Sequence, residues 1–389
     1  MVVTMIRQAP IGAEAHPMTQ APTLIPAARP LIGSEERLAV DAVLRSGSLA
    51  QGPEVAAFEA EFSSHFVLGR PTVAVNSGTS GQHLGLLAAG VGPGDEVIVP
   101  SFTFAAVANS VALAGATPVF ADIEPDHFTL DPARVREAIT ERTKGIMPVH
   151  LYGHPFQVDA LERLAREHGL AIFEDAAQAH GASWLDRPVG TIGEFAMFSL
   201  YPTKNMTAIE GGMVVCRADE TARRVRLLRN QGMETQYANE VVGFNARMSD
   251  VHAAVGRAQL RKVDGWTRIR QRNAAFLDRE LALVPGVTPP RVAPEATHVY
   301  HQYAIRVAAG ERDRIRAALL EEHGVATGVY YPIPNHRLPS LAPYAPAVDL
   351  PESDRAAAEV LSLPVHPSLS EHDLHRIVAG VVAVAAAGS

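Results

Sequence analysis

Lys204 is the residue of this sequence best suited to covalent chemistry. It lies in the run from Phe198 to Gly212, where an apolar stretch and a Pro-containing turn lead to a pair of glycines. Only three of the 34 basic residues are lysines, and the rest are arginines. An arginine cannot form an imine, whereas a lysine amine in an apolar pocket can attack a carbonyl group. The position suggests catalysis through a Schiff base; the alternative is a lysine that extends from a loop into solvent.

The turn from Asn76 to Ser80 could bind an anion. It follows the apolar strand expected at Val73 to Val75 and precedes a helix expected from about Gln82. Backbone amides at a helix N-terminus, with a glycine and hydroxyl side chains beside them, form a cradle for phosphate. No Gly-Lys-Ser/Thr follows and the Gly-x-Gly-x-x-Gly spacing is absent, which excludes two common nucleotide-binding motifs. A purely structural turn is the alternative.

Two adjacent carboxylates end another apolar strand, in the run from Phe173 to His180. Glu174 and Asp175 point to opposite faces of a strand, so only one of them can face a ligand at the carboxyl end of a sheet. The small residues Ala176 and Ala177 leave space there for a flat molecule. The alternative is an aspartate that caps the next turn.

A phosphate cradle, a strand-end acid and a buried lysine are together what pyridoxal phosphate (PLP) needs. The cofactor requires an anion site, a carboxylate that keeps its pyridine nitrogen protonated, and an amine that forms an imine. Ser199, five residues before Lys204, adds a hydroxyl to this set.

Composition favours small-molecule chemistry over binding to macromolecules. A net charge of -8 without long basic runs gives no stripe for nucleic acid and no polybasic membrane patch. The single cysteine, Cys216, excludes an internal disulfide and a cysteine metal cluster, and we expect no metal. Residues 1–21 lack the apolar core of a signal peptide and are expected to be a disordered tail. The uncharged stretch from Val97 to Ala121 contains prolines and polar residues, so we expect a cytoplasmic protein without a membrane span.

Alternating apolar strands and helices predict an α/β domain over residues 22–265. Continuous apolar runs with helical stretches between them indicate a mainly parallel sheet of seven strands, covered by helices on both faces. The strands are expected at Val73 to Val75, Glu96 to Val99, Thr117 to Asp122, Gly145 to His150, Ala171 to Glu174, Phe195 to Leu200 and Met213 to Cys216. The helices are expected from Ser34, over Glu54 to His65, Pro132 to Thr140 and Val158 to His168.

A smaller α+β domain is predicted over residues 266–389. A long helix is expected over Asp250 to Leu283, across the boundary, and a linker over Val284 to Ala296. The small domain's further elements are strands over His298 to Val307 and Thr327 to Tyr331, and helices over Arg312 to His323 and Glu371 to Ala386. Ser370 is a plausible cap of the last helix. The proline-rich loop from Pro332 to Pro351 is long enough to suggest a binding loop.

From about Leu24 to its C-terminus, the sequence resembles the DegT/DnrJ/EryC1/StrS family of nucleotide-sugar aminotransferases. The resemblance implies the fold type I architecture of PLP-dependent enzymes. It rests on five ordered motifs: Asn76 to Ser80, Gly92 to Pro100, Glu174 to Gln178, Ser199 to Lys204, and Gly243 to Met248.

The resemblance implies roles for the residues around the cofactor, as PLP or its pyridoxamine form. Lys204 would form the internal aldimine and then move a proton between the substrate and the cofactor. Asp175 would pair with the pyridinium nitrogen, Gln178 would hydrogen-bond the phenolic oxygen, and Phe104 would stack on the ring. The phosphate would be held by Gly78, Thr79 and Ser199.

The resemblance also implies a homodimer with shared sites and a nucleotide-linked substrate. Asn245 would reach the phosphate of the neighbouring subunit, although it could simply be a turn residue. Tyr331 and His336 would lie near the sugar and diphosphate, or could pack a domain interface. Arg247 would bind substrate, or a carboxylate within the protein. The acceptor would be a keto-sugar linked to a nucleoside diphosphate, and the amino donor would be L-glutamate.

Two departures from the family pattern concern the pocket. Ile209 stands where many relatives have glycine, so the turn after Lys204 has either an ordinary or a strained conformation. Trp184 stands where a smaller aromatic residue is usual.

A sugar dehydratase on the same fold is an alternative, but such relatives replace the lysine with histidine. A non-catalytic regulatory or ligand-sensing protein that keeps the fold is the other alternative.

Overall fold

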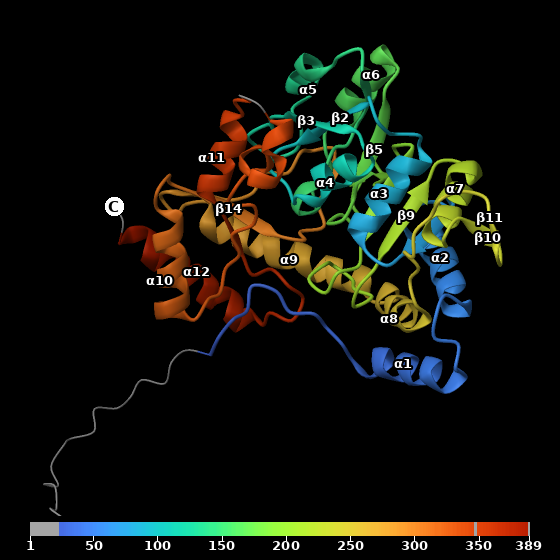
Figure 1. Ribbon diagram of the computed structural model, residues 1–389. Coiled ribbons are helices and arrows are strands. Elements are labelled where there is room, and N and C mark those ends of the chain that lie inside the picture. The colour runs from blue at the N-terminus through green and yellow to red at the C-terminus, as the bar shows by residue number, and fades with distance from the viewer. Residues whose placement is uncertain (1–22, 346–347, 388–389) are drawn as a thin grey trace, which may run out of the picture.

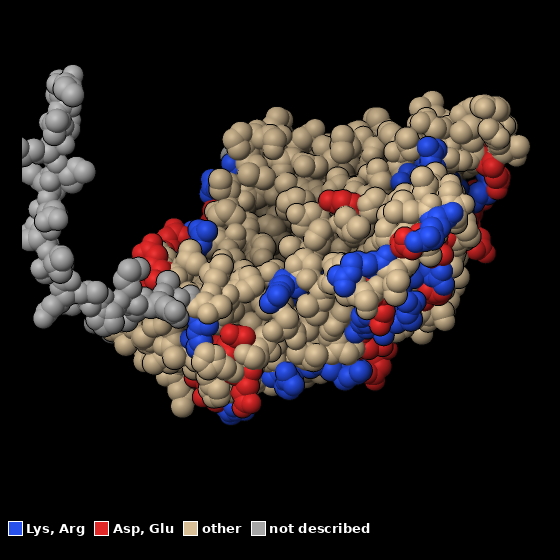
Figure 2. Space-filling view, turned by 90° about the horizontal axis from the view of Figure 1, so that it is seen from below, with Lys and Arg blue, Asp and Glu red and all other residues tan. Residues whose placement is uncertain are grey.

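The computed structural model describes residues 23–345 and 348–387, so the expected tail at 1–21 lies outside the described residues. A large α/β part contains the main sheet, and a smaller C-terminal part lies to one side of it (Figure 1). None of the described helices is long and apolar enough to cross a membrane. On the face shown in Figure 2, acidic and basic side chains are interspersed without forming a continuous basic surface.

The main sheet has seven strands, and all seven expected strands are present. Neighbouring strands are parallel except for β9, which runs antiparallel to both of its neighbours. In sheet order the strands are β1 (Thr72–Val75), β9 (Gly212–Cys216), β8 (Phe195–Ser199), β5 (Ala171–Asp175), β4 (Thr143–Ile146), β2 (Glu96–Pro100) and β3 (Thr117–Ala121). The strand predicted over Gly145 to His150 began and ended too late: β4 covers Thr143–Ile146, and beyond it Val149 forms an isolated bridge with Asp175.

Helices cover both faces of this sheet, as the continuous apolar strands predicted. Val97 and Phe173 face the layer formed by α3, α4 and α7, whereas Ile98 and Ile172 face the layer that contains α5 and α6. α2 and α8 pack on that second face near β8 and β9, and α1 packs on α8. The bounds are α1 (Ser34–Ser46), α2 (Pro53–Phe66), α3 (Gly78–Ala88), α4 (Ala106–Leu113), α5 (Pro132–Ala138), α6 (Val158–His168), α7 (Asp219–Arg229) and α8 (Asp250–Leu260).

The long helix expected over Asp250 to Leu283 is wrong, because two helices occupy this stretch. α8 ends at Leu260 and α9 (Val263–Leu281) begins after a short turn. In that turn Lys262 forms ion pairs of 2.9 and 2.7 Å with Glu35 and Glu36 of α1. The ion pairs therefore tie the break between the two helices to the N-terminal helix.

The C-terminal part has its own antiparallel sheet and apolar core. The sheet order is β12 (Val287–Thr288), β14 (Tyr303–Val307) and β15 (Val360–Leu363). Its core joins this sheet to α9, α10 (Arg312–His323) and α12 (Glu371–Ala386). α12 begins as expected, with the Ser370 side chain accepting a hydrogen bond from the backbone of Asp373. A domain boundary at 265/266 remains a proposal, and it would fall in the first turn of α9.

Two strand predictions for this part need correction. The strand expected over His298 to Val307 begins only at Tyr303. Thr327 to Tyr331 forms no strand, and Gly328 makes only an isolated bridge to Ser362 of β15. The strand β15 was not predicted from the sequence. Tyr331 has a φ of 60°, which no extended strand accommodates.

The remaining elements are short. In one small sheet β6 (Ser183–Trp184) pairs with β13 (Ala296–Thr297) on one side and β7 (Arg187–Pro188) on the other. In another, β10 (Met233–Thr235) pairs with β11 (Ala238–Asn239). The proline-rich loop carries the 3-10 helices η2 (Asn335–Arg337) and η3 (Pro339–Tyr344), and α11 (Pro351–Glu359) follows; a further 3-10 helix, η1 (Leu151–Gly153), lies in the large part.

Candidate active site

A cavity of about 440 Å³ lies at the carboxyl ends of the parallel strands, where ligands bind in open α/β sheets. Its walls come from both parts of the chain. It brings together eight of the predicted site residues: Gly78, Thr79, Phe104, Asp175, Gln178, Ser199, Lys204 and Tyr331. The three that do not line it are Asn245, Arg247 and His336.

Lys204 follows β8 on a tight turn, in which its backbone N–H donates to the carbonyl of Tyr201. Its amine makes no hydrogen bond or ion pair with any residue that the structure describes. Burial lowers the pKa of this amine to about 8, although the negative charge of Asp175 opposes the shift. At pH 7.5 about a quarter of such amines are neutral, against about one in a thousand at the ordinary pKa. The amine is therefore available as a nucleophile.

Asp175 is the last residue of β5 and is buried at the floor of the cavity. Its carboxylate accepts hydrogen bonds from the Gln82 side chain at 2.7 Å and from the backbone N–H of Ala177 at 2.9 Å. Burial raises the pKa of Asp175, while those hydrogen bonds and the charge of Lys204 oppose the shift. A carboxylate in such surroundings is stabilised further by a ligand that brings a positive charge.

Glu174 points to the opposite face of the same strand, as strand alternation predicts. Its carboxylate accepts backbone hydrogen bonds of 2.8 Å from Gly190, Ile192 and Gly193, and a ring nitrogen of His150 lies 3.2 Å away. These contacts give Glu174 a structural role, since none of its partners lines the cavity.

The turn from Asn76 to Ser80, here called the anion turn, leads into α3. This helix begins at Gly78, whereas the sequence predicted a start at about Gln82. The Ser77 hydroxyl caps the helix by accepting from the backbone of Ser80 at 3.1 Å. The first N–H groups of the helix have no partner within it and open toward the cavity wall. A Cβ atom on Gly78 would lie 3.0 Å from the sulfur of Met197 and 3.3 Å from Cβ of Ser199. A side chain at this position would crowd the cradle, which explains the glycine.

Gln178 is held from two sides. Its Oε1 accepts from the backbone N–H of Tyr152 at 2.7 Å, and its Nε2 donates to the hydroxyl of Tyr331 at 2.7 Å. Gln178 lines the cavity and is only 5% exposed. Tyr331 thus contacts another cavity residue directly.

Aromatic side chains lie at the opening of the cavity, and the backbone of the turn after Lys204 is strained. Phe104 is 63% exposed and Tyr201 is 48% exposed, so both rings can cover a ligand. The sequence left open whether the turn after Lys204 has an ordinary or a strained conformation. Ile209 has a φ of 69°, so the turn is strained. A β-branched residue in this conformation costs about 1 to 3 kcal/mol.

Asn245 and Arg247 lie on the strand-like segment beside β1, outside the cavity of their own chain. Asn245 is exposed and forms an isolated bridge with Asn230. The Arg247 guanidinium donates to Asn230 Oδ1 at 2.9 Å. The backbone N–H of Asn76, just before the anion turn, donates to the carbonyl of Ala246 at 2.9 Å, so the segment braces that turn.

His336 is buried between the large part and the C-terminal loop. Its Nδ1 lies 2.6 Å from the Ser101 hydroxyl and its Nε2 lies 3.5 Å from Asp354. The residue types are those of a hydrolase triad, but Ser101 is fully buried and cannot reach a substrate. The arrangement connects β2 to the proline-rich loop.

Several residues that line the cavity were not predicted from the sequence. Gln82 follows the anion turn by two residues, but nothing in its own sequence position distinguishes it from the neighbouring polar residue His83. His301, Gln302 and Tyr330 come from the C-terminal part, and no local motif marked them. The buried Oε1 of Gln82 and Nδ1 of His301 have no hydrogen-bond partner among the described residues.

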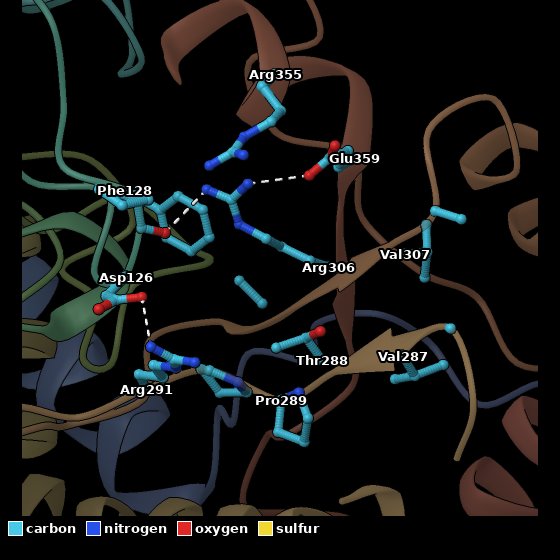
Figure 3. A pocket seen from close by; sticks show the side chains of 15 residues that line it. Asp126, Phe128, Val287, Thr288, Pro289, Arg291, Arg306, Val307, Arg355 and Glu359 are labelled. Carbon is cyan, nitrogen blue, oxygen red and sulfur yellow. Dashed lines mark hydrogen bonds and ion pairs between the residues drawn. The ribbon is translucent and has the colours of Figure 1, made fainter.

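A second cavity of about 440 Å³, shown in Figure 3, lacks these features. Three arginine side chains enter it, but each is paired: Arg291 with Asp126, Arg306 with Glu359 and Arg355 with Glu352. The Arg306 guanidinium also lies 4.7 Å from the centre of the Phe128 ring. The cavity holds no lysine, histidine or cysteine, so the one beside Lys204 is the candidate for catalysis.

The fold and the site together define a fold type I aminotransferase of the PLP-dependent class. The chain belongs to the DegT/DnrJ/EryC1/StrS aminotransferase family, whose model matches residues 30–382.

Relatives and solved structures agree with this assignment. The chain is 43% identical over 350 residues to dTDP-3-amino-3,4,6-trideoxy-alpha-D-glucose transaminase from Streptomyces venezuelae, covering 90% of this chain and 91% of that protein. It is 42% identical to a pleiotropic regulatory protein of Geobacillus stearothermophilus, covering 87% of this chain and 91% of the other. The crystal structure of S. venezuelae DesV in complex with a ketimine intermediate superposes with a TM-score of 0.88 at 41% identity, covering 93% of this chain and 99% of that chain.

Proposed function

We propose that this protein is a PLP-dependent aminotransferase that moves an amino group from L-glutamate to a keto-sugar linked to a nucleoside diphosphate. The observation that carries the proposal is the unpartnered amine of Lys204, in one cavity with a buried carboxylate and a helix N-terminus. These groups match the cofactor's carbonyl, ring nitrogen and phosphate. The described residues contain no cluster that could hold a metal ion instead.

The cofactor supplies the electron sink of the reaction, and the protein supplies placement and proton transfer. Gly78, Thr79 and Ser199 would hold the phosphate, and Phe104 would cover the ring. Asp175 would keep the ring nitrogen protonated. The Lys204 amine would take and give a proton at the substrate carbon, a task that its lowered pKa suits near neutral pH.

A nucleotide-linked sugar is the substrate class that the relatives support. One relative is named for a dTDP-sugar, and another, 38% identical over 370 residues, is a GDP-perosamine synthase from Caulobacter vibrioides. Of the three residues expected on the substrate side, Tyr331 lines the cavity, and we assign Arg247 to the site of a second subunit. His336 is buried against Ser101 outside the cavity, so a contact with substrate would require the proline-rich loop to move. The identity of the sugar stays open, because the relatives act on different nucleotide-linked sugars.

A regulatory protein without catalysis is the weaker candidate, although one relative bears a regulatory name. Lys204, Asp175 and the anion turn are all in place, and a protein that only senses a ligand has no need of the lysine. The lysine equally disfavours the dehydratase alternative. The single cysteine suits the cytoplasm, which we propose as the location.

The charge of the cavity supports a homodimer with shared sites. Among the described residues that line it, Lys204 is the only cation. The ligands bring a cofactor phosphate, a diphosphate and carboxylates, so one chain leaves most of this negative charge unmatched. Asn245 and Arg247 do not line the cavity of their own chain, and a second subunit is the simplest source of these missing contacts.

A mixed dimer tests whether sites are shared. Lys204→Ala and Asn245→Ala subunits, each with its own tag, are co-expressed and the doubly tagged dimer is isolated. If Asn245 serves the neighbouring subunit, the dimer contains one intact site and shows about half of the wild-type activity at limiting cofactor. If Asn245 serves its own subunit, neither site is intact. Activity no higher than in the parent variants would then exclude sharing.

Absorbance spectroscopy tests the function itself. We expect the purified protein to be yellow, and L-glutamate to convert its visible band into that of the pyridoxamine form in a single turnover. A panel of nucleotide-linked keto-sugars should then restore the original band for the correct acceptor. If no amino donor changes the spectrum, the aminotransferase proposal fails and the regulatory alternative takes its place.

A further inference from the structure

Two hydrogen bonds fix which atom of Gln178 faces a ligand. The backbone N–H of Tyr152 can only donate, so the side-chain atom 2.7 Å from it must be the carbonyl oxygen. The opposite orientation would place an NH₂ group against an N–H group. The amide nitrogen therefore lies on the other side, where it donates one hydrogen to the Tyr331 hydroxyl at 2.7 Å.

The second amide hydrogen has no partner among the residues that the structure describes. Gln178 lines the cavity, so this hydrogen is available to a ligand there. The site thus presents a hydrogen-bond donor at Gln178. Burial raises the pKa of Tyr331 above its ordinary value, so the hydroxyl stays protonated and neutral.

The two tyrosines that hold Gln178 are themselves fixed by packing. Tyr152 has a φ of 58° and Tyr331 a φ of 60°, a conformation that few residues other than glycine adopt. Their rings stack with centres 6.3 Å apart, and both meet the edge of Phe102, at 6.4 and 5.7 Å. Two unusual backbone conformations thus converge on one side chain, where surrounding contacts maintain them.

We infer that Tyr331 is a positioning residue that acts through Gln178, holding the amide so that the site offers a donor, and no acceptor, to the cofactor's phenolic oxygen. The inference rests on the proposed contact between Gln178 and that oxygen. A donor stabilises the deprotonated form of an acceptor oxygen and so lowers the pH at which the bound cofactor loses its proton. Tyr331 therefore sets the protonation state of the cofactor without touching the reacting atoms.

The test is a pH titration of the visible absorbance of the holoenzyme, without substrate. Tyr331→Phe keeps the ring and removes only the hydroxyl, which frees the amide to rotate. The midpoint of the titration should rise by roughly 0.5 to 1 pH unit, the equivalent of one hydrogen bond. Gln178→Leu should raise it by at least as much. Tyr303→Phe is the matched control, because the Tyr303 hydroxyl makes a bond of the same 2.7 Å length to Asp278, away from the cavity.

Each outcome has one reading. A rise in the Tyr331 and Gln178 variants, with no change in Tyr303→Phe, supports the inference. A rise in Gln178→Leu alone overturns the role of Tyr331 and leaves the Gln178 contact in place. No rise in either overturns the Gln178 contact, while conversion by glutamate in the same samples would show that the proposed function stands. A rise in the Tyr303 control overturns the inference, since any lost hydroxyl would then suffice.

Discussion

Lys204→Ala is expected to lower aminotransferase activity by at least about 10⁴-fold, because no other amine in the described part of the cavity can replace it. The variant should still bind PLP, since the anion turn and Asp175 contact other parts of the cofactor. Transfer activity is measured with glutamate and the identified acceptor, and cofactor retention by absorbance after gel filtration.

Lys204→Arg is the matched variant for charge. It keeps a cation at this position but cannot form an imine, so we expect the same loss of activity. Borohydride reduction provides a second readout, because it should fix the cofactor to the wild-type chain and to neither variant. Wild-type turnover in either variant would remove Lys204 from the mechanism.

Asp175→Asn is expected to lower the rate of proton abstraction by roughly 10²- to 10³-fold, the usual effect of removing one preorganised electrostatic contact. The neutral amide cannot hold the ring nitrogen protonated. Cofactor affinity should fall by less than about tenfold, because the phosphate contacts are unchanged. Stopped-flow spectra with glutamate give the rate, and titration of the apoprotein gives the affinity.

Glu174→Gln is the control for Asp175, since the two carboxylates are adjacent in sequence but face opposite sides of β5. Glu174 accepts three backbone hydrogen bonds, and an amide would place two donors where acceptors are needed. This variant should lose about 1 to 3 kcal/mol of stability in thermal unfolding, while the folded fraction keeps its rate. Comparable losses of rate and cofactor binding in Asp175→Asn would make Asp175 structural instead.

The sequence was sufficient to predict the half of the site built from local motifs. Asp175 ends a strand of the main sheet, and Lys204 and Gly78 follow two others. The carboxyl ends of strands that run in the same direction lie at one edge of a sheet. Apolar runs buried on both faces identified those strands. Local patterns thus placed the three chemical groups of the site together.

The remaining cavity residues come from the C-terminal part, and their positions depend on how this part packs against the large part. No local sequence pattern encodes that packing. His301 and Gln302 belong to a segment that reads as a strand but begins pairing only at Tyr303. The region before Pro332 reads as a strand as well, yet Tyr331 adopts a left-handed conformation that turns its hydroxyl to Gln178. Tertiary contacts override local preference at these positions, and they are where the sequence prediction failed.

The antiparallel strand β9 has a consequence for the order in which the protein assembles. β1 leads into the anion turn. Among the named strands of the described chain its partner is β9, with Thr72 opposite Val215, and its last residue, Val75, forms an isolated bridge with Arg247. During synthesis, the turn emerges from the ribosome long before its supporting strand and the bracing residue Ala246. A nascent chain that ends before β9 has no fixed cradle for the cofactor's phosphate. The cofactor can therefore bind only after β9 has been synthesised. Its binding stabilises only molecules whose main sheet is complete.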